Sequence, residues 1–185
     1  MNERIILGID PGTTIMGYGI IQCKDKKMEV INLGVIYLNK IDDHALKLKT
    51  IFERTIHLIE NYTPDELAIE APFFGKNVQS MLKLGRAQGV AIAAALSRDL
   101  SITEYSPKKI KQSITGNGNA SKEQVAAMLK TLLSIKELPK DLDATDGLAA
   151  AVCHYFQSSK TVGGIKSYTG WDSFLKSNPE KEIKR

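Results

Sequence analysis

The sequence predicts an α/β fold in which one mixed sheet carries helices on both of its faces. Three strand-like segments follow one another at the start of the chain, and after them strand-like segments alternate with amphipathic helical ones. The length of 185 residues, 43% of them hydrophobic, suits one globular domain with a well-developed core. These observations favour a single five-stranded sheet over two separate domains.

The first three strands are separated only by turn signals. Residues 4–9 form a short apolar run that ends at the turn-rich sequence Asp10-Pro-Gly-Thr-Thr. Residues 16–23 and 28–38 are the next two strand-like runs, with Asp25-Lys-Lys between them as a hairpin tip. Because so short a connection joins antiparallel strands, we expect the three to form an antiparallel meander.

Helices and short strands then alternate. Apolar residues at helical spacing predict a first helix around residues 48–59, which ends before Pro64, and an Ala- and Gly-rich second helix at 77–97. Short apolar runs at 67–70 and 101–105 each predict a strand, and we expect these two strands to be parallel. Three strands followed by helix–strand pairs is the element order of the ribonuclease H-like fold.

The rest of the folded part is expected to be helical. A Gly- and Asn-rich turn at 116–119 separates two helices, and Ser121 with Gln124 forms a capping-box pattern at the start of the second. A last helix is expected from Asp143 to Phe156.

Beyond this helix the composition turns to Ser, Lys and Gly. We therefore divide the chain into a ribonuclease H-like domain over residues 1–157 and a basic, flexible tail over 158–185.

The composition argues against several classes of protein. Cys23 and Cys153 lie far apart and have no paired Cys or His spacing, which disfavours a disulfide framework or a zinc site. The N-terminus lacks the apolar run of a signal peptide, and the longest apolar stretch, residues 90–96, is too short to span a bilayer. We therefore expect a cytoplasmic protein with no membrane partner.

Four acidic residues occupy positions where a carboxylate needs a partner. Asp10 and Glu70 each end an apolar strand, where an isolated charge costs free energy. Asp143 and Asp146 are three residues apart, so a helix places both on one face. Together the four would form a site of hard oxygen ligands suited to Mg²⁺, with Mn²⁺ as a substitute. Two such ions per site would activate a water and stabilise the leaving oxygen in phosphodiester hydrolysis.

Three of these acids also have a purely structural explanation, whereas Glu70 at a strand end is harder to explain in that way. Asp10 before Pro-Gly is a typical turn residue, and Asp143 with Asp146 could cap a helix and complement its dipole. Their joint occurrence in this element order favours a metal-dependent nuclease.

Three segments resemble motifs of the RuvC family of Holliday-junction resolvases: Gly8-Ile-Asp-Pro-Gly-Thr-Thr-Ile-Met-Gly-Tyr-Gly, Ile69-Glu-Ala-Pro-Phe-Phe-Gly-Lys-Asn and Asp143-Ala-Thr-Asp-Gly-Leu-Ala-Ala-Ala. They stand in the family's order and at its spacing, within a similarity that covers residues 4–157. The resemblance implies that Asp10, Glu70, Asp143 and Asp146 are catalytic and bind Mg²⁺. It also implies a homodimer that binds four-way DNA junctions and nicks two opposed strands symmetrically during recombination and repair. The RuvA and RuvB branch-migration proteins are its implied partners.

The residues on the DNA side follow from the same resemblance. Lys111 and Lys122 match basic positions important to the family's catalysis, and a lysine near the scissile phosphate would stabilise developing negative charge. Phe73 matches the family's stacking aromatic, and we expect Lys76 and Asn77 in its loop to touch DNA. The alternatives are lysines on a solvated helix surface and a hydrophobic plug under the loop. The net charge of +4 permits a polyanionic partner.

Two further surfaces are weaker predictions. The helix at 77–97 is a candidate dimer interface, because symmetric cuts at a two-fold junction suit a C2 dimer; simple core packing explains it equally well. Its candidate contacts are Leu82, Gly85, Gly89, Ala93 and Leu96. Gly12 and Gly17, with the threonines between them, are assigned to a turn whose backbone amides could approach a phosphate.

Three rival functions are weighed against this one. A ribonuclease H-like nuclease acting on RNA or an RNA–DNA hybrid would have to read 2′-hydroxyls, which a sequence does not reveal. An ATPase of the actin and sugar-kinase group shares the Asp-x-Gly-Thr-Thr loop, but it needs two such domains. A junction-binding module without catalysis should have lost an acid, and all four are present.

Overall fold

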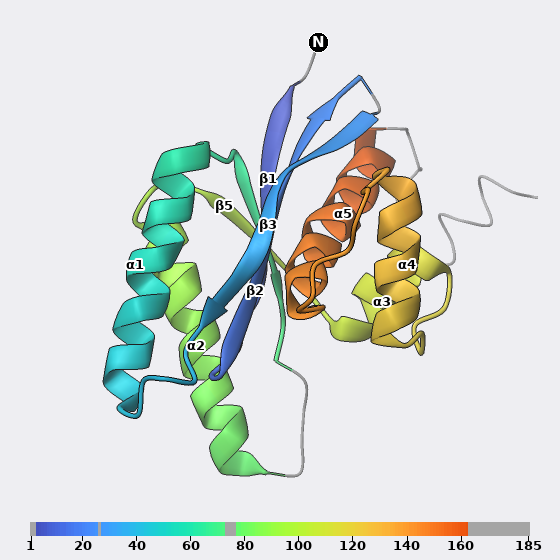
Figure 1. Ribbon diagram of the computed structural model, residues 1–185. Coiled ribbons are helices and arrows are strands. Elements are labelled where there is room, and N and C mark those ends of the chain that lie inside the picture. Colours follow the sequence, from blue (N-terminus) through green and yellow to red (C-terminus); the bar gives the residue numbers. More distant parts are fainter. Residues whose placement is uncertain (1–2, 26, 73–76, 163–185) are drawn as a thin grey trace, which may run out of the picture.

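The computed structural model describes residues 3–25, 27–72 and 77–162 (Figure 1). Within these residues five strands form one sheet in the order β3-β2-β1-β4-β5. The meander β1-β2-β3 is antiparallel, whereas β4 is parallel to β1 and β5 is parallel to β4. The predicted mixed five-stranded sheet is therefore confirmed. Its strands are β1 (Arg4–Asp10), β2 (Ile15–Lys24), β3 (Lys27–Tyr37), β4 (Glu66–Glu70) and β5 (Ser101–Tyr105).

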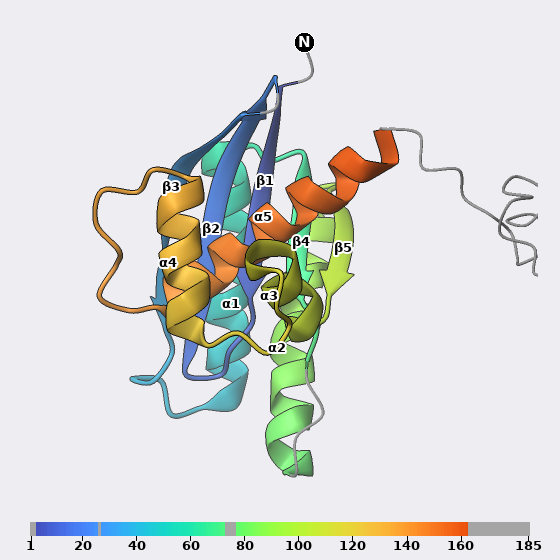
Figure 2. The same cartoon turned by 90° about the vertical axis from the view of Figure 1, so that its right-hand side faces the viewer.

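Helices cover both faces of the sheet, as Figures 1 and 2 show. On one face lie α1 (His44–Tyr62) and α2 (Val78–Leu96); on the other lie α3 (Pro107–Thr115), α4 (Lys122–Leu132) and α5 (Asp143–Val162). None of these described helices combines the length and the apolar character that crossing a bilayer requires.

Each face of the sheet has its own core, because successive strand residues point to opposite sides. Leu7 and Ile69 belong to the core shared with α1 and α2. Their neighbours Ile6 and Ala68 belong to the core shared with α3, α4 and α5. The apolar strands are therefore buried on both sides, and only their ends open toward polar surroundings.

The helix starts follow local capping chemistry. Ser121 and Gln124 make the two reciprocal hydrogen bonds of a capping box at the start of α4, which confirms that prediction. Ser106 caps α3, and Pro107 occupies its first turn, where a missing N–H costs nothing. These caps fix where α3 and α4 begin and therefore where their lysines stand.

The end of the last helix was predicted wrongly. The helix α5 continues to Val162, beyond the expected end at Phe156, because no Gly or Pro interrupts the added residues. The guanidinium of Arg4 also donates to the Ser158 hydroxyl over 2.6 Å, which ties this turn to β1. The start of the predicted tail is thus helical, and residues 163–185 lie outside the described residues.

Candidate metal centre

The four predicted carboxylates come together at one end of the sheet. Asp10 ends β1 and Glu70 ends β4, and because these strands are neighbouring and parallel, their last residues lie at the same edge. Asp143 and Asp146 stand in the first turn of α5. Carboxylate oxygens of Asp10, Asp143 and Asp146 lie within 4.8 Å of one another. Glu70 lines the same pocket as Asp10 and Asp146.

The pocket at these acids has a volume of about 200 Å³ and combines acidic, basic and apolar walls. The acids come from the sheet and α5, two lysines come from α3 and α4, and apolar residues form the remaining wall. Its lining residues are Asp10, Glu70, Pro107, Ile110, Lys111, Lys122, Val125, Asp146 and Ala149.

The helix that carries two of the acids lies directly against the sheet backbone. Gly17 on β2 pairs with Asp10, and a Cβ at Gly17 would lie 1.9 Å from the carbonyl oxygen of Asp143. A Cβ at Gly147 would likewise lie 2.5 Å from Cα of Tyr18. Backbone touches backbone at both places, which only glycine permits. This close approach brings the acids of α5 within reach of Asp10.

Gly17 therefore lies within a strand, and its assignment to a phosphate-binding turn was wrong. The signal that could have found its role is a glycine within a strand-like run, which often marks close approach of another backbone. Sequence alone does not say which backbone approaches.

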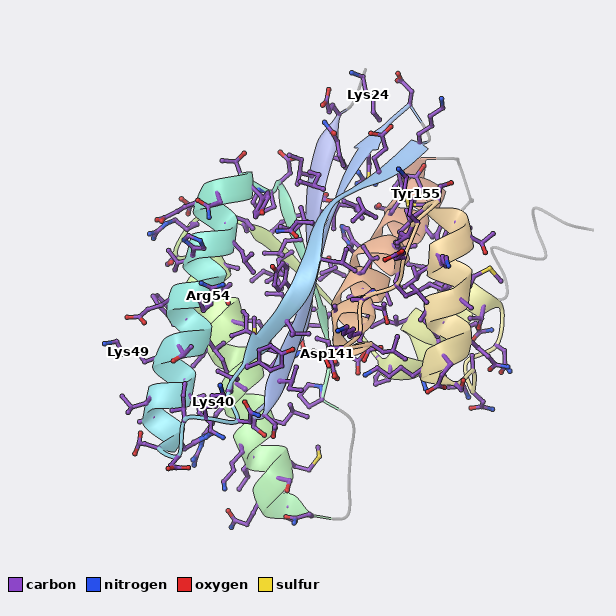
Figure 3. The ribbon with its side chains drawn as sticks, viewed as in Figure 1. Lys24, Lys40, Lys49, Arg54, Asp141 and Tyr155 are labelled. Carbon is purple, nitrogen blue, oxygen red and sulfur yellow. The ribbon has the colours of Figure 1, made fainter. Side chains whose placement is uncertain are left out.

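Contacts near both ends hold α5 in this place; Figure 3 labels Asp141 just before the helix and Tyr155 near its other end. Just before the helix, the Tyr37 hydroxyl at the end of β3 donates to the carboxylate of Asp141. At the other end the guanidinium of Arg4 lies 6.0 Å from the ring centroid of Tyr155. His154 on the same part of α5 is hydrogen-bonded to Glu66 at the start of β4, over 2.9 Å.

Burial and mutual repulsion make the two strand-end acids difficult to ionise. Burial, followed by the nearby carboxylates of Glu70 and Asp146, raises the pKa of Asp10 from 3.8 to about 8. Burial and the charge of Asp146 raise the pKa of Glu70 from 4.5 to about 7. A bound divalent cation would remove both penalties, because it replaces lost hydration and attracts every carboxylate. Since all the donors are carboxylate oxygens, the residues present fit Mg²⁺ or Mn²⁺.

Lys122 lies inside the cluster of acids. Its Nζ is 2.9 Å from Oδ1 of Asp143 and 2.6 Å from Oδ2 of Asp146. Partial burial lowers the pKa of Lys122, but the hydrogen bonds to Asp146 and Asp143 outweigh that effect, so its pKa is raised overall. The lysine therefore stays charged, and the first turn of α4 holds it in the wall of the pocket.

The other predicted DNA-side residues divide into three groups. Lys111 lines the pocket, and its charge lowers the pKa of Glu70, although burial raises it more. The side chain of Asn77 accepts a hydrogen bond from the Ser80 amide over 3.1 Å, so it caps α2 while remaining exposed. Phe73 and Lys76 lie outside the described residues.

The raised pKa values predict how pH changes the stability of the metal-free protein. Because the folded state binds protons more tightly than the unfolded state at Asp10 and Glu70, stability falls as pH rises from about 4 to about 8. Mg²⁺ would bind the acids in their ionised form, so its stabilising effect would grow over the same range. We expect saturating Mg²⁺ to raise the melting temperature more at about pH 8 than at about pH 5.5.

Thermal melts in EDTA and in Mg²⁺ at the two pH values measure this difference. The control is the double variant Asp10→Asn with Glu70→Gln, in which Mg²⁺ should raise the melting temperature by nearly the same amount at both pH values. If Mg²⁺ raised the melting temperature of the native protein equally at both pH values, these two acids would not bind the ion.

Comparison with known proteins shows the family to which the chain belongs. Residues 6–154 match the family model described as "Crossover junction endodeoxyribonuclease RuvC". A protein of that name from Christiangramia forsetii is 71% identical over 180 residues, which cover 97% of this chain and 93% of the relative. One from Bacteroides fragilis is 61% identical over 183 residues, which cover 98% of this chain and 97% of the relative.

A solved structure shows the same fold. The chain described as "T. thermophilus RuvC in complex with Holliday junction substrate" aligns with a TM-score of 0.79 and 29% identity. The alignment covers 85% of this chain and 96% of that one. The predicted ribonuclease H-like fold is confirmed by this likeness, and the chain belongs to the RuvC family of crossover junction endodeoxyribonucleases.

Proposed function

We propose that this chain resolves four-way DNA junctions by Mg²⁺-dependent hydrolysis of phosphodiester bonds in two opposed strands. The observation that carries the proposal is the convergence of Asp10, Glu70, Asp143 and Asp146 beside Lys122, in a chain that matches the RuvC family over residues 6–154. The relative solved with a Holliday junction supports the choice of substrate.

The four acids would hold the metal, with two ions per site and Mn²⁺ as a substitute. When bound, such ions supply charge neutralisation at the phosphate and a water of lowered pKa. The chain itself orients the acids through β1, β4 and the closely packed α5. Its apolar wall at Ile110 and Val125 limits water on the α3–α4 side of the pocket.

Lys122 is placed to stabilise the negative charge that develops on the phosphate during cleavage. Its ammonium group already lies among the acids, and a phosphate oxygen at the metal would offer it a further acceptor. We expect Lys122→Met to lower the single-turnover cleavage rate about 10²-fold at saturating Mg²⁺, which is typical of losing one group that stabilises transition-state charge.

The matched control for this variant is Lys109→Met. Lys109 is an exposed lysine on α3 and is not among the residues that line the pocket. A Lys122→Met enzyme that cleaves as fast as Lys109→Met would show that Lys122 is a surface lysine without a catalytic role.

The remaining contacts would position the DNA. Lys111 faces the pocket from α3 and suits a phosphate next to the scissile one. Phe73 would stack on a base opened at the crossover, with Lys76 beside it. Asn77, exposed at the start of α2, would contact the DNA that enters this loop.

The homodimer would form through α2. The first turns of this helix extend beyond the sheet (Figures 1 and 2), and there Val78 and Leu82 are 67% and 51% exposed. Among the described residues, and apart from the helix's own backbone, no atom lies within 4 Å of a Cβ built at Gly85 or Gly89, so a second copy could approach closely there. Leu96, further along the helix, is 58% exposed. These exposures favour the interface over the alternative of core packing.

The cellular setting follows from the family. A chain that cuts junctions would act in the cytoplasm during recombination and repair, alongside the RuvA and RuvB branch-migration proteins. Residues 1–157 would form the nuclease domain and residues 158–185 its basic tail, although the first residues of that range continue α5.

A substrate panel tests the proposal. Synthetic four-way junction, matched duplex and RNA–DNA hybrid are incubated with the full chain, with Mg²⁺ or with EDTA. We expect cleavage of the junction only, and only with Mg²⁺. Preferred cleavage of the hybrid would instead support a ribonuclease H-like enzyme that acts on RNA.

A further inference from the structure

A buried amide connects α2 to the metal centre through the sheet. Gln88 is 7% exposed and stands among the buried alanines of α2, where a polar side chain costs free energy unless it is hydrogen-bonded. Its Nε2 lies 2.7 Å from Oε2 of Glu104 on β5 and 3.4 Å from the backbone carbonyl oxygen of Glu70. An amide nitrogen has two hydrogens, which match these two acceptors.

The peptide group that follows Glu70 is held on both sides. Its N–H, which belongs to Ala71, donates to the carbonyl of Tyr105 over 2.9 Å. Its C=O, which belongs to Glu70, accepts from Gln88. This peptide is thus held by one contact from β5 and one from α2.

The contacts on this peptide also bear on the position of Glu70, because its Cα stands at the end of β4. The side chain of Glu70 lines the pocket on the α5 face, whereas Ile69 before it packs on the α1–α2 face. If the carbonyl were released, the end of β4 could shift, and the Cα that carries the carboxylate would move relative to Asp10. We propose that Gln88 is a positioning residue, which fixes the carboxylate of Glu70 for metal binding by holding the carbonyl of the same residue. This inference rests on the proposed metal centre.

Three variants separate this role from general packing. Gln88→Met keeps the length of the side chain and removes both donors. Glu104→Ala removes the other acceptor but leaves Gln88 free to donate to Glu70. Gln88→Lys keeps a donor group that can reach both acceptors. For each full-length variant, the Mg²⁺ concentration that gives half of the maximal rise in melting temperature is measured without DNA.

We expect Gln88→Met to raise this Mg²⁺ midpoint about fivefold, the factor that corresponds to the loss of one neutral hydrogen bond. Glu104→Ala and Gln88→Lys should stay within about twofold of the native protein, since the contact with Glu70 survives in both. A Gln88→Met protein with lowered stability but an unchanged midpoint would overturn the inference, and so would equal shifts in Gln88→Met and Glu104→Ala.

Two further outcomes are also decisive. If Gln88→Met does not melt cooperatively, the inference is tested with Gln88→Lys instead. A fivefold rise of the Mg²⁺ midpoint in that variant would overturn the inference. If the native protein itself shows no rise in melting temperature with Mg²⁺, it is the proposed metal centre that fails, and the role of Gln88 fails with it. Because the measurement needs no DNA, a wrong choice of substrate does not affect it.

Discussion

Asp10→Asn is expected to abolish junction cleavage and, in metal-free buffer near pH 8, to stabilise the fold. The carboxylate of Asp10 is largely buried and lies next to Glu70 and Asp146, so ionising it in the folded state is unfavourable. An amide of the same shape carries no charge and removes that repulsion. Active sites commonly sacrifice stability for function in this way.

The size of the stability gain can be estimated from the pKa of Asp10, which is raised from 3.8 to about 8. After a discount for the part of the carboxylate that solvent still reaches, we expect a gain of about 2 kcal/mol. For a chain of this size this is a rise of roughly 4–8 °C in melting temperature. The gain should shrink as pH is lowered toward about 4, because the native carboxylate is then protonated in the folded protein.

Thermal melts in EDTA and a junction-cleavage assay measure the two effects on the same preparation. Asp42→Asn is the matched control, since Asp42 is an exposed carboxylate before α1, and it should leave both unchanged. Cleavage by Asp10→Asn at the native rate would contradict the assignment of Asp10 to the metal.

Gly17→Ala is expected to disrupt the metal centre although residue 17 carries no catalytic group. The added Cβ would lie 1.9 Å from the carbonyl oxygen of Asp143, a backbone atom that moves only if α5 moves. Lifting the start of α5 separates Asp143 and Asp146 from Asp10. We expect a loss of stability of about 1–3 kcal/mol, as for an overpacked core. Cleavage should fall about 10²-fold, because small misplacements of catalytic groups have effects of that size.

The control for this variant is Gly34→Ala, which also adds a methyl group to a strand. The three atoms nearest to its Cβ all belong to the side chain of Tyr18, the first at 2.8 Å, and that side chain can shift. Melting temperature and single-turnover cleavage at increasing Mg²⁺ are measured for both variants. If Gly17→Ala cleaved as well as Gly34→Ala, the close approach of α5 would not determine the geometry of the acids.

The parts of the site that depend on local sequence could be predicted from it. Asp10 and Glu70 end apolar runs, and parallel neighbouring strands bring such residues to one edge. The capping box of Ser121 and Gln124 is a local pattern as well, and it places Lys122 in the first turn of its helix. Asp143 and Asp146 could be placed on one helix face by their spacing.

The parts that depend on contacts between distant elements could not be predicted. The spacing of Asp143 and Asp146 does not say how closely α5 lies against β2, and this approach depends on Gly17 and Gly147. In the sequence, Gln88 is one polar residue in an alanine-rich helix, and its role is visible only once the helix is placed against β4. The end of α5 was missed because polar residues at a helix end resemble a tail when their tertiary contact, here Arg4 with Ser158, is unknown.

The proposed activity is tested most directly by mapping the nicks in a four-way junction whose four strands are labelled separately. With Mg²⁺, the native protein should cut two opposed strands at symmetric positions near the crossover, and with EDTA it should cut none. Nicks in a single strand, nicks at unrelated positions, or cleavage that persists in EDTA would contradict a metal-dependent resolvase built on these four carboxylates.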